Sequence, residues 1–138
     1  MKRTLTTADQ AVQKVFNLLK PLRDDVSMSG FVFPYNRPIS SQKEDVVINA
    51  LALNADQEQN GILNVNVHVP NLQLGGDNTQ PNRVRFQVIS NKAIELLDYY
   101  DGFDFSLTLD NAGELIRDGE YWFMNIRVRY NSIRLENN

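Results

Sequence analysis

The chain has 138 residues, and 14 Lys and Arg against 17 Asp and Glu give it a formal net charge of −3. A hydrophobic fraction of 42% and a charged fraction of 22% are typical of a globular protein and exclude a fully disordered chain. The absence of cysteine excludes a disulfide framework, a zinc-thiolate site and a cysteine nucleophile. His68 is the only histidine, so the commonest acid-base chemistry would depend on one imidazole.

No targeting or membrane segment is expected. Met1-Lys2-Arg3 is followed by a polar stretch, which does not fit a secretory signal peptide. The longest apolar run, residues 46–53, is far shorter than the roughly 18 to 20 residues of a membrane-spanning helix. We therefore expect a cytoplasmic setting, or a particle assembled there, with no general attraction to nucleic acid or anionic lipid.

The first predicted element is a helix over residues 8–20. Thr7 and Gln10 have the spacing of a capping box, in which each side chain bonds the backbone N–H of the other residue. Apolar residues then recur at steps of three and four, which gives the helix one buried stripe. These are Val12, Val15, Phe16, Leu19 and Leu22. Pro21 discourages continuation of the helix.

Three strands are predicted next. Residues 30–35 have the composition of a short strand, which Pro34 confines to a sheet edge, and residues 36–44 form a polar loop. Residues 45–53 carry apolar side chains on both faces, so both faces should be covered, one of them by another subunit. Residues 54–60 connect this strand to the next, with a hairpin turn at Asn60-Gly61.

The third strand shows strict alternation, which predicts an aliphatic inner side and a polar outer side. The aliphatic residues are Leu63, Val65, Val67 and Val69, and the polar ones are Asn64, Asn66 and His68. Residues 71–81 follow as a long loop.

A second amphipathic helix is predicted over residues 82–99, ended by Asp101-Gly102, with Arg85, Lys92 and Glu95 more exposed. Its apolar stripe consists of Phe86, Ile89, Ala93, Leu96, Leu97 and Tyr100. A fourth strand at 103–109, a turn at 110–113 and a short strand at 115–116 follow.

The last predicted strand begins after Gly119. One side carries Trp122, Met124, Ile126, Val128 and Tyr130, and the other carries Phe123, Asn125, Arg127 and Arg129. The order α-β-β-β-α-β-β predicts a single α+β domain over residues 1–138, in which an antiparallel or mixed sheet has both helices packed on one face. The opposite face should then carry Asn64, Asn66, His68, Arg127 and Arg129, if their strands are neighbours.

Two apparent motifs are better explained by structure than by chemistry. Gly75-Gly76 precedes a helix, but no phosphate-loop motif surrounds it, which favours a flexible connector. Asp98, Asp101 and Asp104 lack the spacing of a calcium loop, which favours roles at the helix end. We therefore predict no metal site, cofactor site or catalytic residue.

The order of elements resembles the tail terminator and tail completion proteins, which lie at the head-to-tail junction of long-tailed bacteriophages. The resemblance covers nearly the whole chain and is one of pattern. It rests on helix 8–20, strand 30–34 with its polar loop, paired strands 45–51 and 61–70, the late helix and segment 122–128. The extended loop 72–80 departs from the pattern and leaves a head-completion role open.

The resemblance implies a protein without enzymatic activity that forms a homo-oligomeric ring, expected to be a hexamer. The ring would terminate the tail tube, contact the tail tube protein and the head connector, and let DNA pass. The protein would lie in the virion tail or neck after assembly in the host cytoplasm.

In such a ring we expect strand 45–53 and the loops 36–44 and 54–60 to contact the neighbouring subunit. The predicted interface residues are Val47, Asn49, Leu51 and Leu53. Arg127 and Arg129 would face the lumen or an anion.

Two alternatives remain. One is a small α+β module that binds a ligand or nucleic acid through the face with His68, Arg127 and Arg129, in which case binding should weaken steeply with salt. The other is an enzyme that uses carboxylates and His68.

Overall fold

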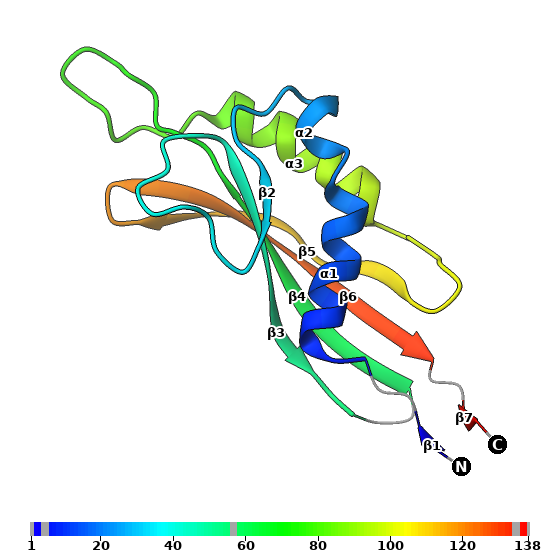
Figure 1. Cartoon of the computed structure of the whole chain (residues 1–138). Coiled ribbons are helices and arrows are strands. Elements are labelled where there is room, and N and C mark those ends of the chain that lie inside the picture. Colours follow the sequence, from blue (N-terminus) through cyan, green and yellow to red (C-terminus); the bar gives the residue numbers. More distant parts are fainter. Residues whose placement is uncertain (1, 4–5, 56–57, 134–135, 138) are drawn as a thin grey trace.

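The computed structural model describes residues 2–3, 6–55, 58–133 and 136–137, and within them it has an α+β fold (Figure 1). A mixed five-stranded sheet has the strand order β2-β3-β4-β6-β5. Its strands are β2 (Val32–Pro34), β3 (Asp45–Leu53), β4 (Glu58–His68), β5 (Ser106–Asp118) and β6 (Tyr121–Ile133). The helices are α1 (Ala8–Leu19), α2 (Leu22–Asp25) and α3 (Arg83–Leu97). Two short strands, β1 (Lys2–Arg3) and β7 (Glu136–Asn137), pair separately.

Helix α1 begins at the predicted capping box. The Thr7 hydroxyl accepts a hydrogen bond from the Gln10 N–H at 3.1 Å, and the Gln10 side chain accepts one from the Thr7 N–H at 2.9 Å. The helix ends at Leu19, and Pro21 then caps the one-turn helix α2. The proline therefore separates two helices, as expected from a residue that cannot continue the backbone hydrogen-bond pattern.

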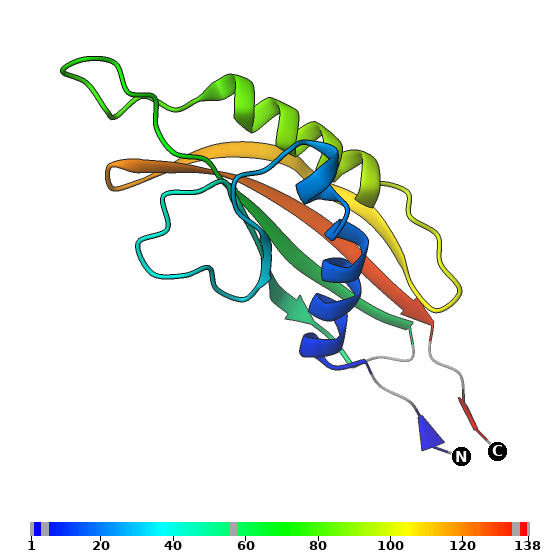
Figure 2. The same ribbon diagram turned by 45° about the horizontal axis from the view of Figure 1, so that its top comes forward.

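Helices α1 and α3 cover the same face of the sheet (Figures 1 and 2), which confirms the predicted arrangement. The core between helices and sheet is almost entirely aliphatic. Its fully buried members include Val12, Val15, Leu19, Ile48, Leu63, Val65, Val67, Phe86, Ile89, Leu97, Leu107, Ile126, Val128 and Tyr130. Burial of this much apolar area is the main stabilising contribution to the fold.

Strand β3 has the predicted bounds, and the predicted alternation of β4 is confirmed, but the hairpin turn at Asn60-Gly61 is wrong. Both residues lie inside β4, where Gly61 pairs with Leu53 on one side and with Tyr130 on the other. A Cβ on Gly61 would lie 2.5 Å from the Ala52 carbonyl oxygen. This glycine therefore permits close approach of two strands. Residues 56–57 of the predicted connection lie outside the described residues.

The predicted turn at residues 110–113 is also wrong, because β5 runs through it as one strand. Two register shifts against β6 absorb the extra residues, and Gly113, with φ of 133°, lies against Met124. Bulges of this kind keep a long strand paired where its composition favours a turn. Phe103, predicted as the start of this strand, lies before it and is exposed.

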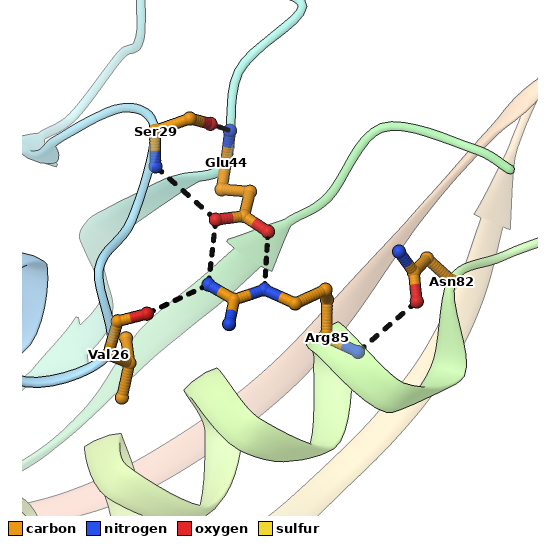
Figure 3. Close-up of polar contacts among 5 residues, drawn as sticks. All are labelled: Val26, Ser29, Glu44, Asn82 and Arg85. Atoms are coloured by element: carbon orange, nitrogen blue, oxygen red, sulfur yellow. Dashed lines mark hydrogen bonds and ion pairs between the residues drawn. The ribbon is translucent and has the colours of Figure 1, made fainter.

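Two predictions about α3 need correction. The helix ends at Leu97, and Tyr99 then takes a φ of 56°, so Asp101-Gly102 lies beyond the helix end. Arg85, predicted to be exposed, instead reaches across to the segments before β2 and β3 (Figure 3). Its guanidinium donates to both Glu44 carboxylate oxygens at 2.7 and 2.8 Å and to the Val26 carbonyl at 2.9 Å.

The short strand β2 is parallel to β3 and lies at the sheet edge, as Pro34 predicted. It pairs only with Val46, Val47 and Ile48 of β3.

Candidate functional site

The sheet face opposite α1 and α3, here called the open face, is covered by no helix in the described part of the chain. Strands β4 and β6 are neighbours, which brings together the polar residues that alternation had assigned to this side. Asn64 lies opposite Arg127, Asn66 opposite Asn125, and His68 opposite Phe123. The prediction of a shared polar face is thereby confirmed.

Four asparagine side chains form a hydrogen-bonded row across β3, β4 and β6, here called the amide row. Asn64 donates to the Asn49 side-chain oxygen at 3.0 Å, and Asn125 donates to the side-chain oxygens of Asn64 and Asn66 at 3.2 and 2.7 Å. Asn125 is 6% exposed although none of the described helices lies over it. The amide row gives the open face a fixed pattern of donors and acceptors without formal charge.

The two arginines of the open face differ in their partners. Arg129 donates to the Asp110 carboxylate of β5 at 2.9 Å, so its charge is balanced within the subunit. Among the described residues Arg127 has no ion-pair partner, and its neighbours across the strands are Asn64 and Asn111. The open face therefore presents the Arg127 charge beside the amide row, together with the exposed carboxylate of Glu114, which lies opposite Asn125 on β5.

His68 lies at the end of the open face, where loop 36–44 covers the sheet. A pocket of 170 Å³ lies beside it, lined also by Arg37, Lys43 and Trp122. The imidazole packs against Phe123 with ring centroids 5.7 Å apart. Burial, and then the nearby Arg37 guanidinium, lower the pKa of His68 to about 4, so the ring is neutral at pH 7.

Asp45 fixes the loop above His68. It is 1% exposed and accepts hydrogen bonds from the Phe31 N–H at 3.2 Å and the Ser41 hydroxyl at 2.6 Å. Arg37 lies 3.4 Å from the same carboxylate. Sequence reasoning did not identify this aspartate, since its contacts depend on the path of loop 36–44 and on the position of Phe31, 14 residues earlier in the chain.

The four predicted interface residues of β3 do not form one surface. Val47 is buried within the chain, and Asn49 belongs to the amide row. A register shift between Ala50 and Ala52 breaks the alternation, and it leaves Leu51 55% exposed while Leu53 packs against the core. The apolar residues on both faces of this strand are thus explained in its first half by burial in the subunit itself.

The aspartates and glycines that resemble a calcium loop and a phosphate loop in the sequence have separate structural roles. Asp98 accepts a hydrogen bond from the Leu109 N–H at 3.2 Å, and Asp104 forms an ion pair with Lys14 at 2.8 Å. Gly75, with φ of 55°, lies in a turn closed by a Leu74–Asp77 bridge, away from the start of α3. Among the described residues no group of three or more His, Asp or Glu side chains is placed to hold a metal ion.

The chain matches no protein-family model and no curated protein. Among the described residues, none of the helices has the length and apolar character needed to cross a lipid bilayer.

Proposed function

We propose that this chain is a structural subunit of the head-to-tail junction of a long-tailed bacteriophage or prophage. In this proposal it forms a homo-oligomeric ring that terminates the tail tube and joins it to the capsid connector, and it carries out no catalysis. Its place is the virion neck, and it assembles in the host cytoplasm. The observation that supports it best is the open face, a sheet surface that bears the amide row and that no described helix covers.

The chemistry of the open face suits the wall of a channel through which DNA passes. A strongly basic wall would retain the phosphate backbone, because each neutralised phosphate adds to the affinity. Here the Arg129 charge is balanced by Asp110, and the amide row offers hydrogen bonds without net charge. We therefore place the open face, with Arg127, toward the lumen of the ring.

The test is the mass of the protein by light scattering on a sizing column across a wide concentration range, with negative-stain images of the largest species. We expect a closed ring with a central opening that binds tail tubes at their ends. A strict monomer at every concentration, without binding to tail tubes, would contradict the proposal.

A second measurement tests the placement of the open face. Arg127→Glu changes the charge of that face and, on this proposal, leaves the mass of the ring unchanged, because the residue lies in the lumen. Dissociation of the ring by this substitution would show that the open face is instead a contact between subunits.

One alternative, a module that binds a small ligand or nucleic acid, is supported by the pocket beside His68 and by Arg127, which has no ion-pair partner in the part of the chain that the structure describes. This alternative predicts DNA or anion binding by the isolated subunit that weakens steeply with salt and is lost in the Arg127→Ala, Arg129→Ala double variant. Salt-independent or absent binding would leave the ring proposal in place.

A further inference from the structure

An apolar groove of 580 Å³, here called the Phe31 groove, lies between β2 and loop 36–44. Its walls include Phe31, Phe33 and Pro38, and the two phenylalanine rings meet edge to face at 6.2 Å. Phe31 is 48% exposed. Exposed aromatic surface in a concave site is typical of a place where another protein binds.

The Phe31 groove has a rigid frame. The buried Asp45 holds the Phe31 N–H on one side and the Ser41 hydroxyl on the other, so it links the two walls. The bidentate contact of Arg85 with Glu44 fixes the end of the loop to α3 (Figure 3). A Cβ on Gly30 would lie 2.0 Å from the Asp45 carboxylate, so this close contact requires glycine. A preformed groove loses little conformational entropy on binding.

Two cationic side chains lie at the rim of the Phe31 groove, and one of them, Arg23, also forms an ion pair with Asp24 at 3.7 Å. The Arg23 guanidinium lies 4.3 Å from the centre of the Phe31 ring. Lys43 lines the groove, is exposed, and has no ion pair within the part of the chain that the structure describes. An aromatic side chain flanked by acidic residues would match both the apolar walls and the charged rim.

Such a side chain is present at the other end of the same molecule. In loop 98–105 Phe103 is 99% exposed and Tyr99 is 82% exposed. Asp101 and Asp104, both exposed, flank Phe103. The loop is held in place by hydrogen bonds from the Gly102 N–H to the Phe105 carbonyl and from the Leu107 N–H to the Tyr100 carbonyl, and by the ion pair of Lys14 with Asp104.

Loop 36–44, which forms one wall of the Phe31 groove, and loop 98–105 lie at opposite ends of the sheet, as Figures 1 and 2 show. The strand register agrees with this placement. Asp45, which lines the groove, pairs with His68 at one end of β4. Ser106, which follows the loop, pairs with Asn131, and Asn131 lies opposite Asn60 near the other end of β4. Eight residues of β4 separate these ends by about 26 Å. Phe103 therefore cannot reach the groove of its own subunit.

We propose that Phe103 of one copy inserts into the Phe31 groove of the next copy, with Asp101 and Asp104 facing Lys43 and Arg23. The contact joins two different surfaces, so each copy uses its groove for one neighbour and its loop for the other. Such a head-to-tail contact closes a ring when the rotation between copies closes. The inference rests on the proposed ring function and names the surfaces that would build it.

The decisive experiment uses two variants, each lacking one half of the contact. Phe103→Asp keeps the groove and loses the aromatic side chain, whereas Phe31→Asp keeps loop 98–105 and places a carboxylate in the groove wall. Each alone should be monomeric at concentrations where the unmodified chain assembles, a loss of at least about tenfold in association. An equimolar mixture should give dimers and nothing larger, because only one intact contact can form per pair.

Two controls accompany these variants. Leu74→Asp charges another exposed apolar residue, 52% exposed on loop 71–81, and should assemble normally. Circular dichroism and melting establish that each variant is folded, and Lys43→Glu replaces Phe31→Asp if the latter unfolds.

An independent readout uses the absence of cysteine from the chain. A variant with Gln42→Cys in the groove and Asp101→Cys beside Phe103 should form a ladder of cross-linked multimers on oxidation, whereas either single variant should stop at the dimer. If the Phe103→Asp variant still forms the same ring as the unmodified chain, the proposed contact is wrong, whereas the proposed function is not contradicted.

Two further outcomes would also decide the question. An unmodified chain that stays monomeric, with no ladder from the double cysteine variant, would overturn both proposals. Binding of a different protein through Phe103, without self-association, would overturn the assignment of a second copy as the partner.

Discussion

The two faces of the sheet are stabilised by different interactions. On the helix-covered face the middle parts of β4 and β6 carry fully buried apolar side chains, such as Leu63 and Ile126. On the open face the same strands contribute to the amide row, and Arg129 of β6 forms an ion pair with Asp110 of β5. Apolar burial contributes most of the folding free energy, whereas exposed polar contacts contribute little each.

The difference separates the requirements of folding from those of function. The space between a sheet and the helices that cover it must be filled by closely packed side chains, so the volume and shape of those side chains determine which residues fit. On an open face many different side chains are compatible with a stable fold. A hydrogen-bonded set of amides there holds the side-chain donors and acceptors of the surface in fixed positions. Substitutions on the two faces can measure this contrast directly.

The largest effect is expected on the helix-covered face. Leu63→Ala removes a fully buried side chain from the central strand and should lower the free energy of unfolding by about 3 kcal/mol, through lost transfer energy and a residual cavity. Denaturant unfolding measures it. The matched control is Leu51→Ala on the adjacent strand, where the 55% exposed side chain should cost well under half as much. Equal losses would mean that Leu51 is buried in solution.

His68, on the open face, should make the free energy of unfolding depend on pH. Its folded pKa of about 4 lies below the ordinary 6.5, so the unfolded chain binds the proton more tightly and stability is fully present only above pH 6.5. As the pH falls from 6.5 to 4 the free energy of unfolding should decrease by up to roughly 3 kcal/mol. His68→Gln should flatten this dependence. Because the sequence has no other histidine, one NMR resonance reports the titration, and a midpoint near 6.5 would contradict the burial of the ring.

The amide row should have a smaller effect. Asn125→Ala removes both hydrogen bonds from its side chain to Asn64 and Asn66, and we expect a loss of about 1 to 2 kcal/mol in the free energy of unfolding. Arg127→Ala, two residues along the same face and without an ion-pair partner among the described residues, is the control and should stay within about 0.5 kcal/mol of the unmodified chain. Similar losses at both positions would argue against a cooperative amide row.

The smallest effect should be that of the exposed ion pair. Arg129→Ala should cost less than about 1 kcal/mol, because the two side chains are 52% and 32% exposed and water screens their attraction. A double-mutant cycle with Asp110→Ala isolates the coupling, which should shrink further at high salt. A coupling energy above about 2 kcal/mol would show that the two charges are shielded from water, which contradicts their exposure at the surface.

The polar and aliphatic sides of β4 could be predicted from sequence, because side chains of a strand alternate between faces. The bounds of β3 and the capping box of α1 followed equally from local pattern. Local pattern could not predict which strands lie next to one another or that Val47 is buried within the subunit, since both depend on contacts between distant segments.

The errors have the same origin. Asn60-Gly61 and residues 110–113 have turn composition, yet pairing with β6 keeps both segments extended. The contact of Arg85 with Glu44 joins residues 41 apart, and no periodicity signals it. Of the candidate site, the open face was foreseen and Asp45 was not. The Phe31 groove depends on the path of loop 36–44, which composition does not determine.

The strand order β2-β3-β4-β6-β5 also determines when the sheet can be completed. The β3–β4 and β5–β6 hairpins each join neighbouring segments, but the central β4–β6 pairing joins residues about 60 positions apart, such as Asn64 and Asn125, 61 apart. Closing so long a loop costs more entropy than forming either hairpin, and contacts of this separation slow folding. We therefore expect the two hairpins to form first and to join at β4 and β6 in the rate-limiting step, so that the amide row, which spans this seam, is completed only when the whole sheet is.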